Sequence, residues 1–149
     1  MDVEPSWHGR WNGTSSAAVP PEIFRVLGII RYSAAPARRD GLKIQIARAK
    51  GADVFATASG PKKHILAILG ATAIDYQTVS VDEYVGQFTN GHGFDVICNT
   101  AGGSSLDDAM AAIKYYGHIT SCSAFGTHNL ATGSLRCATL SGVCVLSQC

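Results

Sequence analysis

The chain has 149 residues, 46% of them apolar, and a formal net charge of +1. This length suits one domain with a real hydrophobic core, and the near-neutral charge argues against a polybasic nucleic-acid binder. No apolar stretch approaches the roughly 20 residues that a membrane span needs, so we expect no membrane partner. The first residues lack the basic and apolar regions of a signal peptide, and we expect a cytoplasmic protein.

In chain order, residues 1–22 contain Pro, Gly and Ser in a pattern typical of a tail or linker. The run IFRVLGIIRY at 23–32 can form a strand, and a charged loop follows it. From Gly41 onwards, short helices alternate with short strands. Helices are predicted at 42–50, 59–69, 81–88 and 104–116, and strands at 53–57, 73–75, 94–98, 118–122 and 138–146. Ser104 and Asp107 have the form of a capping box for the fourth helix, and Gly117 is predicted to end it.

Strands that alternate with short helices predict an α/β, Rossmann-like fold: a mainly parallel sheet of about five or six strands with helices on both faces. Whether the run 23–32 supplies the central strand stays open, although an empty centre would expose two strand edges. Ligands of such sheets bind outside the carboxyl ends of the strands. The segments that follow the strands, 57–63, 75–77, 98–103 and 123–129, are therefore the candidates for function.

Several kinds of site are not indicated by any motif. The five cysteines, at positions 98, 122, 137, 144 and 149, form no C-x-x-C pair, which favours small buried side chains over a zinc site. The P-loop, the H-E-x-x-H zinc motif and the G-x-S-x-G nucleophile motif are missing from the sequence. We predict no metal site and assign no catalytic residue.

A family resemblance is visible in three stretches of the sequence. They are GLKIQIARAKGADVFATASGPKK, HGFDVICNTAGG and YYGHITSCSAFGTHNLATGSLRCATLSGV. This stretch, about Gly41–Val143, resembles the nucleotide-binding half of the medium-chain dehydrogenases/reductases, and most closely their zinc-free NADPH:quinone oxidoreductase branch. The resemblance implies hydride transfer from NADPH to a quinone or conjugated carbonyl, with the cofactor supplying the hydride. A catalytically inactive nucleotide-binding or interaction module, or a non-functional fragment, remains the alternative.

The chain departs from the family in two respects. The residues before Gly41 do not resemble the family's GroES-like catalytic domain, so we interpret 23–149 as a truncated dinucleotide-binding domain and expect the isolated chain to be inactive. The motif G-x-G-x-x-G is also missing, because APARRDG stands at 35–41. Side chains there would replace the backbone N–H groups that meet a pyrophosphate, so we expect NADP(H) to bind weakly.

The loop 57–63 after the second strand has two bases and no acid, which favours the 2′-phosphate of NADP over the 2′-hydroxyl of NAD. The resemblance implies that Ser59 and Lys63 contact this phosphate, and that Tyr76 contacts a phosphate or the adenosine. Spacing alone does not distinguish these phosphate contacts from a simpler interpretation, in which Ser59 is a helix cap and Lys63 lies on a solvated helix face.

The resemblance also implies contacts at the other half of the cofactor. Asn99, Thr100 and Gly102 follow the fourth strand, where small residues let the backbone approach a ligand. Asn99 stands where the family often has Asp. The resemblance places Ala124 and Phe125, after the fifth strand, beside the nicotinamide.

Two further features have simpler interpretations. His128 could suggest a general acid, but an exposed loop histidine is the preferred interpretation. The resemblance implies a homodimer that pairs through the edge strand, about Thr139–Val145, because an exposed strand edge is a template for pairing. The expected partners are thus a dinucleotide, a quinone-like small molecule and a second copy of the chain.

Overall fold

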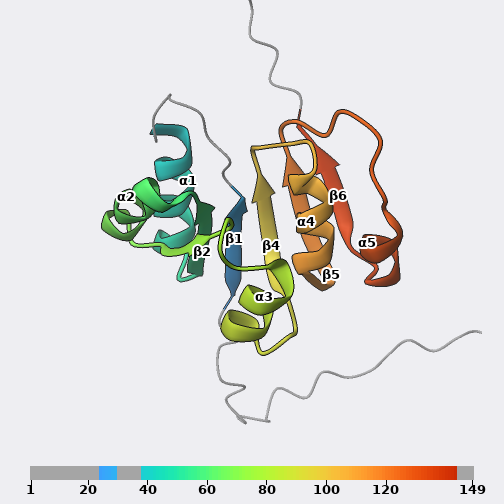
Figure 1. Ribbon diagram of the computed structural model, residues 1–149, viewed down its shortest axis with the longest axis horizontal. Helices are drawn as coiled ribbons and strands as arrows, with labels where there is room; N and C mark the ends of the chain where they lie inside the picture. The colour runs from blue at the N-terminus through green and yellow to red at the C-terminus, as the bar shows by residue number, and fades with distance from the viewer. Residues whose placement is uncertain (1–23, 30–37, 144–149) are drawn as a thin grey trace, which may run out of the picture.

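The computed structural model describes residues 24–29 and 38–143, and the predicted tail at 1–22 lies outside them. Within this part of the chain, strands and helices alternate as predicted (Figure 1). The strands are β1 (Arg25–Ile29), β2 (Asp53–Ala58), β3 (Thr72–Asp75), β4 (Phe94–Asn99), β5 (Ile113–Ser121) and β6 (Thr139–Gly142). The helices are α1 (Arg38–Ala49), the 3₁₀ turn η1 (Gly60–Lys62), α2 (Lys63–Ile68), α3 (Val81–Thr89), α4 (Ser105–Ala112) and α5 (Ala131–Leu135).

The described strands form one parallel sheet in the order β3-β2-β1-β4-β5-β6. β1 lies at its centre, where Leu27 is aligned with Phe55 of β2 on one side and with Ile97 of β4 on the other. The run 23–32 therefore supplies the central strand, and its two neighbours have no exposed edge there. This arrangement confirms the predicted Rossmann-like α/β fold.

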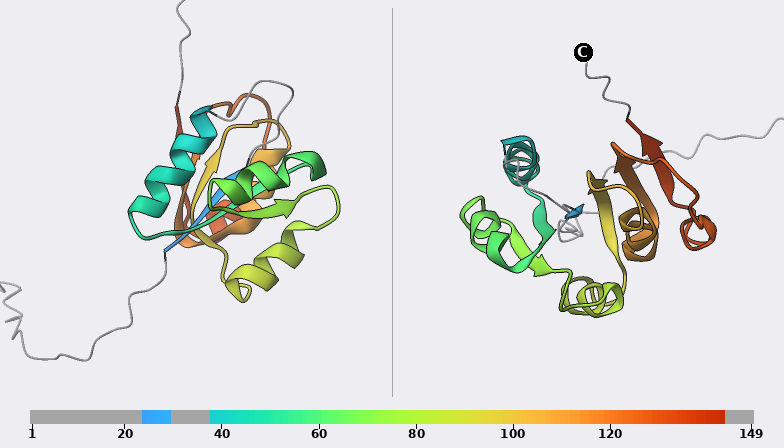
Figure 2. Two further views of the ribbon diagram at one scale, coloured as in Figure 1. Left: turned by 90° about the vertical axis from the view of Figure 1, so that its left-hand side faces the viewer. Right: turned by 45° about the horizontal axis from the view of Figure 1, so that its top comes forward.

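Helices cover both faces of the sheet, as predicted (Figure 2). On one face, α3 and α4 pack over the larger core, in which Phe94 and Ile97 are fully buried. Aromatic rings fill the centre of this core, and the ring centroids of Phe55 and Phe94 lie 5.4 Å apart. On the other face, α1 and α2 pack over a smaller core that includes Ile44 and Leu66. None of the helices among the described residues is long and apolar enough to cross a membrane.

The predicted capping box of the fourth helix is wrong. Ser104 is the N-cap of α4, but its backbone is already helical and its side chain makes no cap hydrogen bond. The carboxylate of Asp107 instead accepts a hydrogen bond from the backbone N–H of Asn129. A complete capping box occurs at α3, where Ser80 and Glu83 each accept from the other's backbone N–H.

The end of the fourth helix also differs from the prediction. α4 ends at Ala112 rather than before Gly117, because Ile113 is buried and already pairs with Phe94 of β4. The register then shifts: the four residues 114–117 lie opposite the single residue 95 of β4, and regular pairing resumes where His118 is aligned with Val96. β5 therefore begins earlier than the predicted strand at 118–122.

Two smaller features were also mispredicted, the start of α1 and the helix α5, and the predicted last strand is tested only in part. α1 begins at Arg38, within the segment predicted as a charged loop. α5 was not predicted, since its sequence ATGSL contains weak helix formers and too few apolar residues to show a helical period. β6 covers Thr139–Gly142 of the predicted strand at 138–146, and positions 144–146 lie outside the described residues.

Candidate functional site

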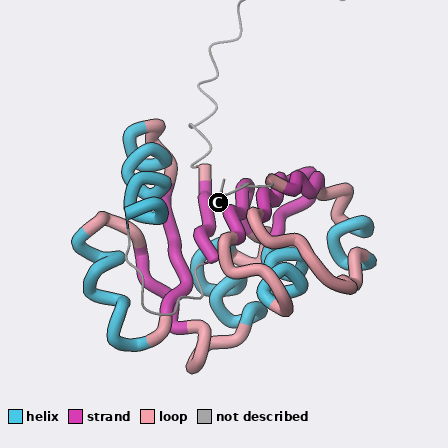
Figure 3. Tube along the Cα trace, turned by 90° about the horizontal axis from the view of Figure 1, so that it is seen from above, coloured by secondary structure: helices cyan, strands magenta, loops and turns pink. Residues whose placement is uncertain are grey.

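The predicted site residues gather at one edge of the sheet, where its parallel strands end. Figure 3 looks down on this edge, over the loops that follow the strands. One group follows the neighbouring strands β2 and β3, and the other follows β4 and β5, with β1 between the two groups. The first group contains Ser59, Lys63 and Tyr76, and the second contains Asn99, Thr100, Gly102, Ala124 and Phe125.

Asn99 organises the turn after β4 from a fully buried position. Its Oδ1 accepts hydrogen bonds from the backbone N–H groups of Ala101 and Gly102, both at 2.9 Å, and from the hydroxyl of Ser105 at 3.2 Å. Its Nδ2 is buried and has no hydrogen-bond partner within the described residues. The two backbone donors fix the orientation of the amide, so the spare group is a donor.

Gly102 and Thr100 join this turn to its neighbours. Gly102 has a φ of +66°, and a Cβ there would lie 2.5 Å from the carbonyl oxygen of Ser123. Only glycine therefore allows the turn after β4 to approach the loop after β5 this closely. Thr100 turns back to the central strand, because both its N–H and its hydroxyl donate to the carbonyl of Ile29.

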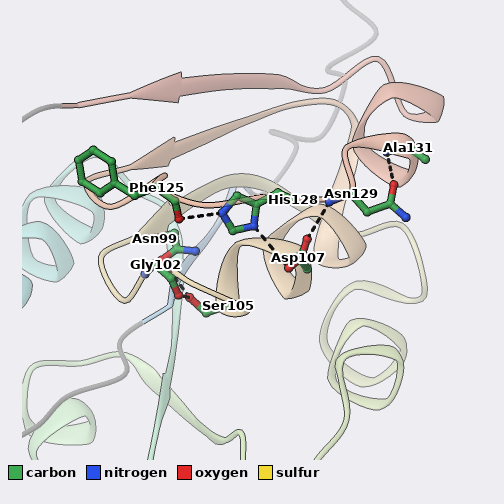
Figure 4. A network of polar contacts seen from close by, with 8 residues as sticks. All are labelled: Asn99, Gly102, Ser105, Asp107, Phe125, His128, Asn129 and Ala131. Carbon is green, nitrogen blue, oxygen red and sulfur yellow. Dashed lines mark hydrogen bonds and ion pairs between the residues drawn. The ribbon is translucent and has the colours of Figure 1, made fainter.

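A polar network attaches the loop after β5 to α4 (Figure 4). The Nδ1 of His128 lies 3.5 Å from a carboxylate oxygen of Asp107, and its Nε2 lies 3.2 Å from the carbonyl oxygen of Phe125. The other oxygen of Asp107 accepts from the N–H of Asn129. This network fixes the backbone of Phe125 while its ring stays exposed.

The preferred interpretation of His128 as an exposed loop residue is wrong, since only 10% of its side chain is exposed. Sequence reasoning missed its contact because Asp107 is 21 positions away and belongs to another element. The structure gives His128 a role in holding the loop, and its ring nitrogens both face acceptor oxygens of the protein.

Lys63 forms an ion pair at the other end of the site. Its Nζ lies 3.3 Å from Oδ2 of Asp75, the last residue of β3. Asp75 is aligned with Ala58 of β2, so the loop after β2 receives an acid from the neighbouring strand. The sequence of 57–63 contains no acid and so gave no indication of this carboxylate. The position of Asp75 at the end of a neighbouring predicted strand was the available indication, because the ends of parallel strands meet at one edge of the sheet.

Ser59 and Tyr76 flank this ion pair along the chain. Ser59 is the N-cap of the 3₁₀ turn, but its side chain makes no cap hydrogen bond, which removes the support for a capping role. Tyr76 follows Asp75 directly and is half-buried.

A cavity of about 310 Å³ adjoins the carboxyl ends of β1 and β2. Its walls come from the ends of β1 and β2, from the segment after β3, and from α3 and α4. Most of its lining was not predicted, because these residues belong to elements far apart in the sequence. The lining residues are Ile29, Thr57, Tyr76, Val79, Ser80, Val81, Tyr84 and Asp108.

Comparison with known protein families matches residues 41–147 to the family described as zinc-binding dehydrogenase. Members of this family bind nicotinamide dinucleotide cofactors. Zinc itself does not fit the described part of this chain, where no three His, Cys, Asp or Glu side chains gather as a metal site. A comparison with curated proteins finds no match.

Several solved structures resemble the chain. An alcohol dehydrogenase superfamily protein from Novosphingobium aromaticivorans is 40% identical over 80% of this chain, with a TM-score of 0.72. An NAD-dependent alcohol dehydrogenase is 27% identical over 80% of the chain, with a TM-score of 0.68. The quinone oxidoreductase of Pseudomonas syringae pv. Tomato DC3000, 22% identical over 82% of the chain with a TM-score of 0.70, shares the fold. The matched regions are 35%, 35% and 38% of those chains, so this chain spans little more than a third of each.

Proposed function

Since this chain belongs to the zinc-binding dehydrogenase family, we propose that it is the nucleotide-binding part of an NADPH-dependent oxidoreductase. The proposed reaction transfers a hydride from the cofactor to a quinone or another conjugated carbonyl. The observation that carries the proposal is the basic group of Lys63 at the strand ends, paired with Asp75, whose chain neighbour Tyr76 lines the cavity. A cation near an aromatic side chain suits a phosphorylated ribose joined to adenine.

At the adenosine end, we assign the 2′-phosphate to Lys63 and Ser59. The ammonium offers charge-assisted hydrogen bonds, and the Ser59 hydroxyl, which makes no cap hydrogen bond to the turn that follows, offers one more donor. Tyr76 stands at the cavity wall, where its ring can cover the adenosine. These three residues form the proposed specificity end of the site.

At the nicotinamide end, the chain positions the cofactor with its backbone. Asn99 holds the turn, Gly102 keeps it close to the next loop, and Thr100 ties it to the central strand. Ala124 and Phe125 face solvent on a loop that Asp107 and His128 hold in place, so they are available to a ligand. The buried Nδ2 of Asn99 is a donor group without a partner among the described residues, which an ordered water would satisfy.

When bound, the nicotinamide supplies the hydride, and the residues of this chain bind and orient it. We assign no side chain to proton transfer. Substrate orientation supplies much of the rate enhancement in such reactions, and in our proposal it depends on protein surface beyond these strand ends. A second copy of the chain is a further proposed partner, and it would pair along β6, the outermost strand on one side of the sheet.

Binding is expected to be weak, since the sequence 35–41 has no G-x-G-x-x-G. Losing two backbone contacts to the pyrophosphate costs about 3–6 kcal/mol, or roughly 10²–10⁴-fold in affinity. A module that binds the nucleotide without catalysis remains the second candidate. An assay of NADPH oxidation with a quinone acceptor separates the two candidates, since only an enzyme would oxidise NADPH steadily.

The test is a fluorescence titration of the chain with NADPH and with NADH. We expect NADPH to bind more tightly, and Lys63→Ala to remove about 1.5–3 kcal/mol of that preference, since the lost contact is charge-assisted. Lys50→Ala removes an equal charge from an exposed position after α1 and serves as the matched control. Tight NADH binding, or equal affinities that Lys63→Ala leaves unchanged, would refute the assignment.

A further inference from the structure

Asp75 is an acid within the proposed phosphate-binding end of the site, and the protein holds it firmly. Only 10% of its side chain is exposed, against 44% for Lys63. Its Oδ1 accepts a hydrogen bond from the N–H of Gln77 at 3.1 Å, which leaves Oδ2 directed at the ammonium of Lys63.

The loop after β2 closes over the same carboxylate. Asp75 is aligned with Ala58, the residue before Ser59. A Cβ added at Gly60 would meet Oδ2 of Asp75 at 3.7 Å, as its nearest neighbour outside the adjoining residues. Asp75 therefore lies directly against the segment that carries the proposed phosphate ligands. Its position is fixed by the strand and by the turn at Gln77.

A 2′-phosphate bound by Lys63 would bring a second anion to an ammonium that already has a carboxylate beside it. The flexible stem of Lys63 can shift toward a ligand, but the buried carboxylate cannot move away. Like charges this close disfavour one another. A 2′-hydroxyl carries no charge, and a carboxylate is able to accept a hydrogen bond from it.

We propose that Asp75 is a specificity-determining residue that competes with the 2′-phosphate for Lys63 and narrows the preference for NADPH over NADH. This inference rests on the proposed function, because it requires that Lys63 meets the 2′-phosphate. Asp75 lowers the affinity for the phosphorylated cofactor, and it leaves the affinity for the unphosphorylated cofactor nearly unchanged.

The test compares Asp75→Asn with the unaltered chain in titrations with NADPH and NADH. Asparagine keeps the size of the side chain and an oxygen that accepts from Gln77, so the turn after β3 is retained. We expect NADPH to bind about tenfold more tightly to Asp75→Asn, with NADH changed less than about twofold. The double variant Lys63→Ala/Asp75→Asn separates the two causes: competition for Lys63 is lost in it, so any effect of Asp75→Asn that remains without Lys63 measures direct repulsion between the carboxylate and the phosphate.

Asp53→Asn is the matched control, because it removes the same charge from an exposed position at the opposite edge of the sheet. It should leave both affinities unchanged. Circular dichroism checks that each variant is folded, and Asp75→Ser repeats the test with a smaller neutral side chain if Asp75→Asn does not fold.

The role of Asp75 and the assignment of Lys63 are overturned by different results. If Lys63→Ala abolishes the NADPH preference while Asp75→Asn leaves it unchanged or reduces it, the role of Asp75 is overturned and the proposed function stands. If NADPH and NADH bind with equal affinity and Lys63→Ala changes neither affinity, the assignment of the 2′-phosphate to Lys63 fails. The proposed competition between Asp75 and the phosphate then fails as well.

Discussion

The turn after β4 and the loop after β2 belong to the same edge of the sheet, but they hold their residues in different ways. In the turn, one buried oxygen of Asn99 accepts from two backbone N–H groups and a hydroxyl. At the end of the loop, the partly exposed Lys63, the first residue of α2, reaches a single carboxylate. The turn is therefore part of what keeps the domain folded, whereas the loop holds a partly exposed charge, to which we have assigned a ligand only as a proposal. Substitutions in the two regions should affect different measurements.

The largest effect is expected for Asn99→Ala. It leaves two backbone donors and the hydroxyl of Ser105 without their acceptor inside the protein, which should lower the free energy of unfolding by about 2–4 kcal/mol. Lys63→Ala, in the loop, should change it by no more than about 0.5 kcal/mol. Urea unfolding measures both. The distinction between the two regions fails if Lys63→Ala destabilises the chain as much as Asn99→Ala does.

A second substitution extends the comparison to the bulge in β5 at the opposite edge. Tyr116 has a φ of +61° in this bulge and is 82% exposed. Glycine adopts this conformation without the steric cost, so Tyr116→Gly should stabilise the chain by about 0.5–1 kcal/mol, net of the extra freedom of the unfolded state. Tyr115→Gly is the control. The backbone of Tyr115 is not in the left-handed region, so this variant should be less stable than the unaltered chain. Thermal melts of both variants give the sign, and destabilisation by Tyr116→Gly would show that its side chain makes a contact worth more than the strain.

The smallest effect concerns pH and the cap of α3. The pKa of Glu83 is lowered, first by the hydrogen bond from the backbone N–H of Ser80 and then by that from its hydroxyl. A lowered pKa in the folded state adds stability above the unfolded pKa, and this contribution is lost as pH falls through the folded value. The urea midpoint of unfolding of the unaltered chain should therefore exceed that of Glu83→Ala at neutral pH. The two midpoints should approach each other in acid. A difference that stays constant with pH would exclude the charged cap as its source.

The sequence predicted the sheet well, because alternating short helices and strands leave few other arrangements. It also predicted which loops meet, since parallel strands bring their carboxyl ends to one edge. The central place of β1 could not be assigned from 23–32 alone. It follows from the pairing of Leu27 with partners on both sides, which depends on segments far along the chain.

The contacts between site residues were less predictable, because they join side chains from different elements. The pair of Lys63 and Asp75 and the contact of His128 with Asp107 each link distant positions, and no local spacing marks them. Local signals also misled at Ser104, where the sequence fits a capping box but the backbone turns helical too early for the hydroxyl to cap.

The central claim is that the carboxyl ends of the strands bind NADPH, and amide chemical-shift mapping during an NADPH titration tests it most directly. We expect the amides that shift to lie after β2, β3, β4 and β5, including those of Lys63, Tyr76, Gly102 and Phe125. The amide of Tyr116, at the opposite edge, should not shift. Shifts that cluster around Tyr116, or no shifts at the strand ends with millimolar NADPH, would contradict the account.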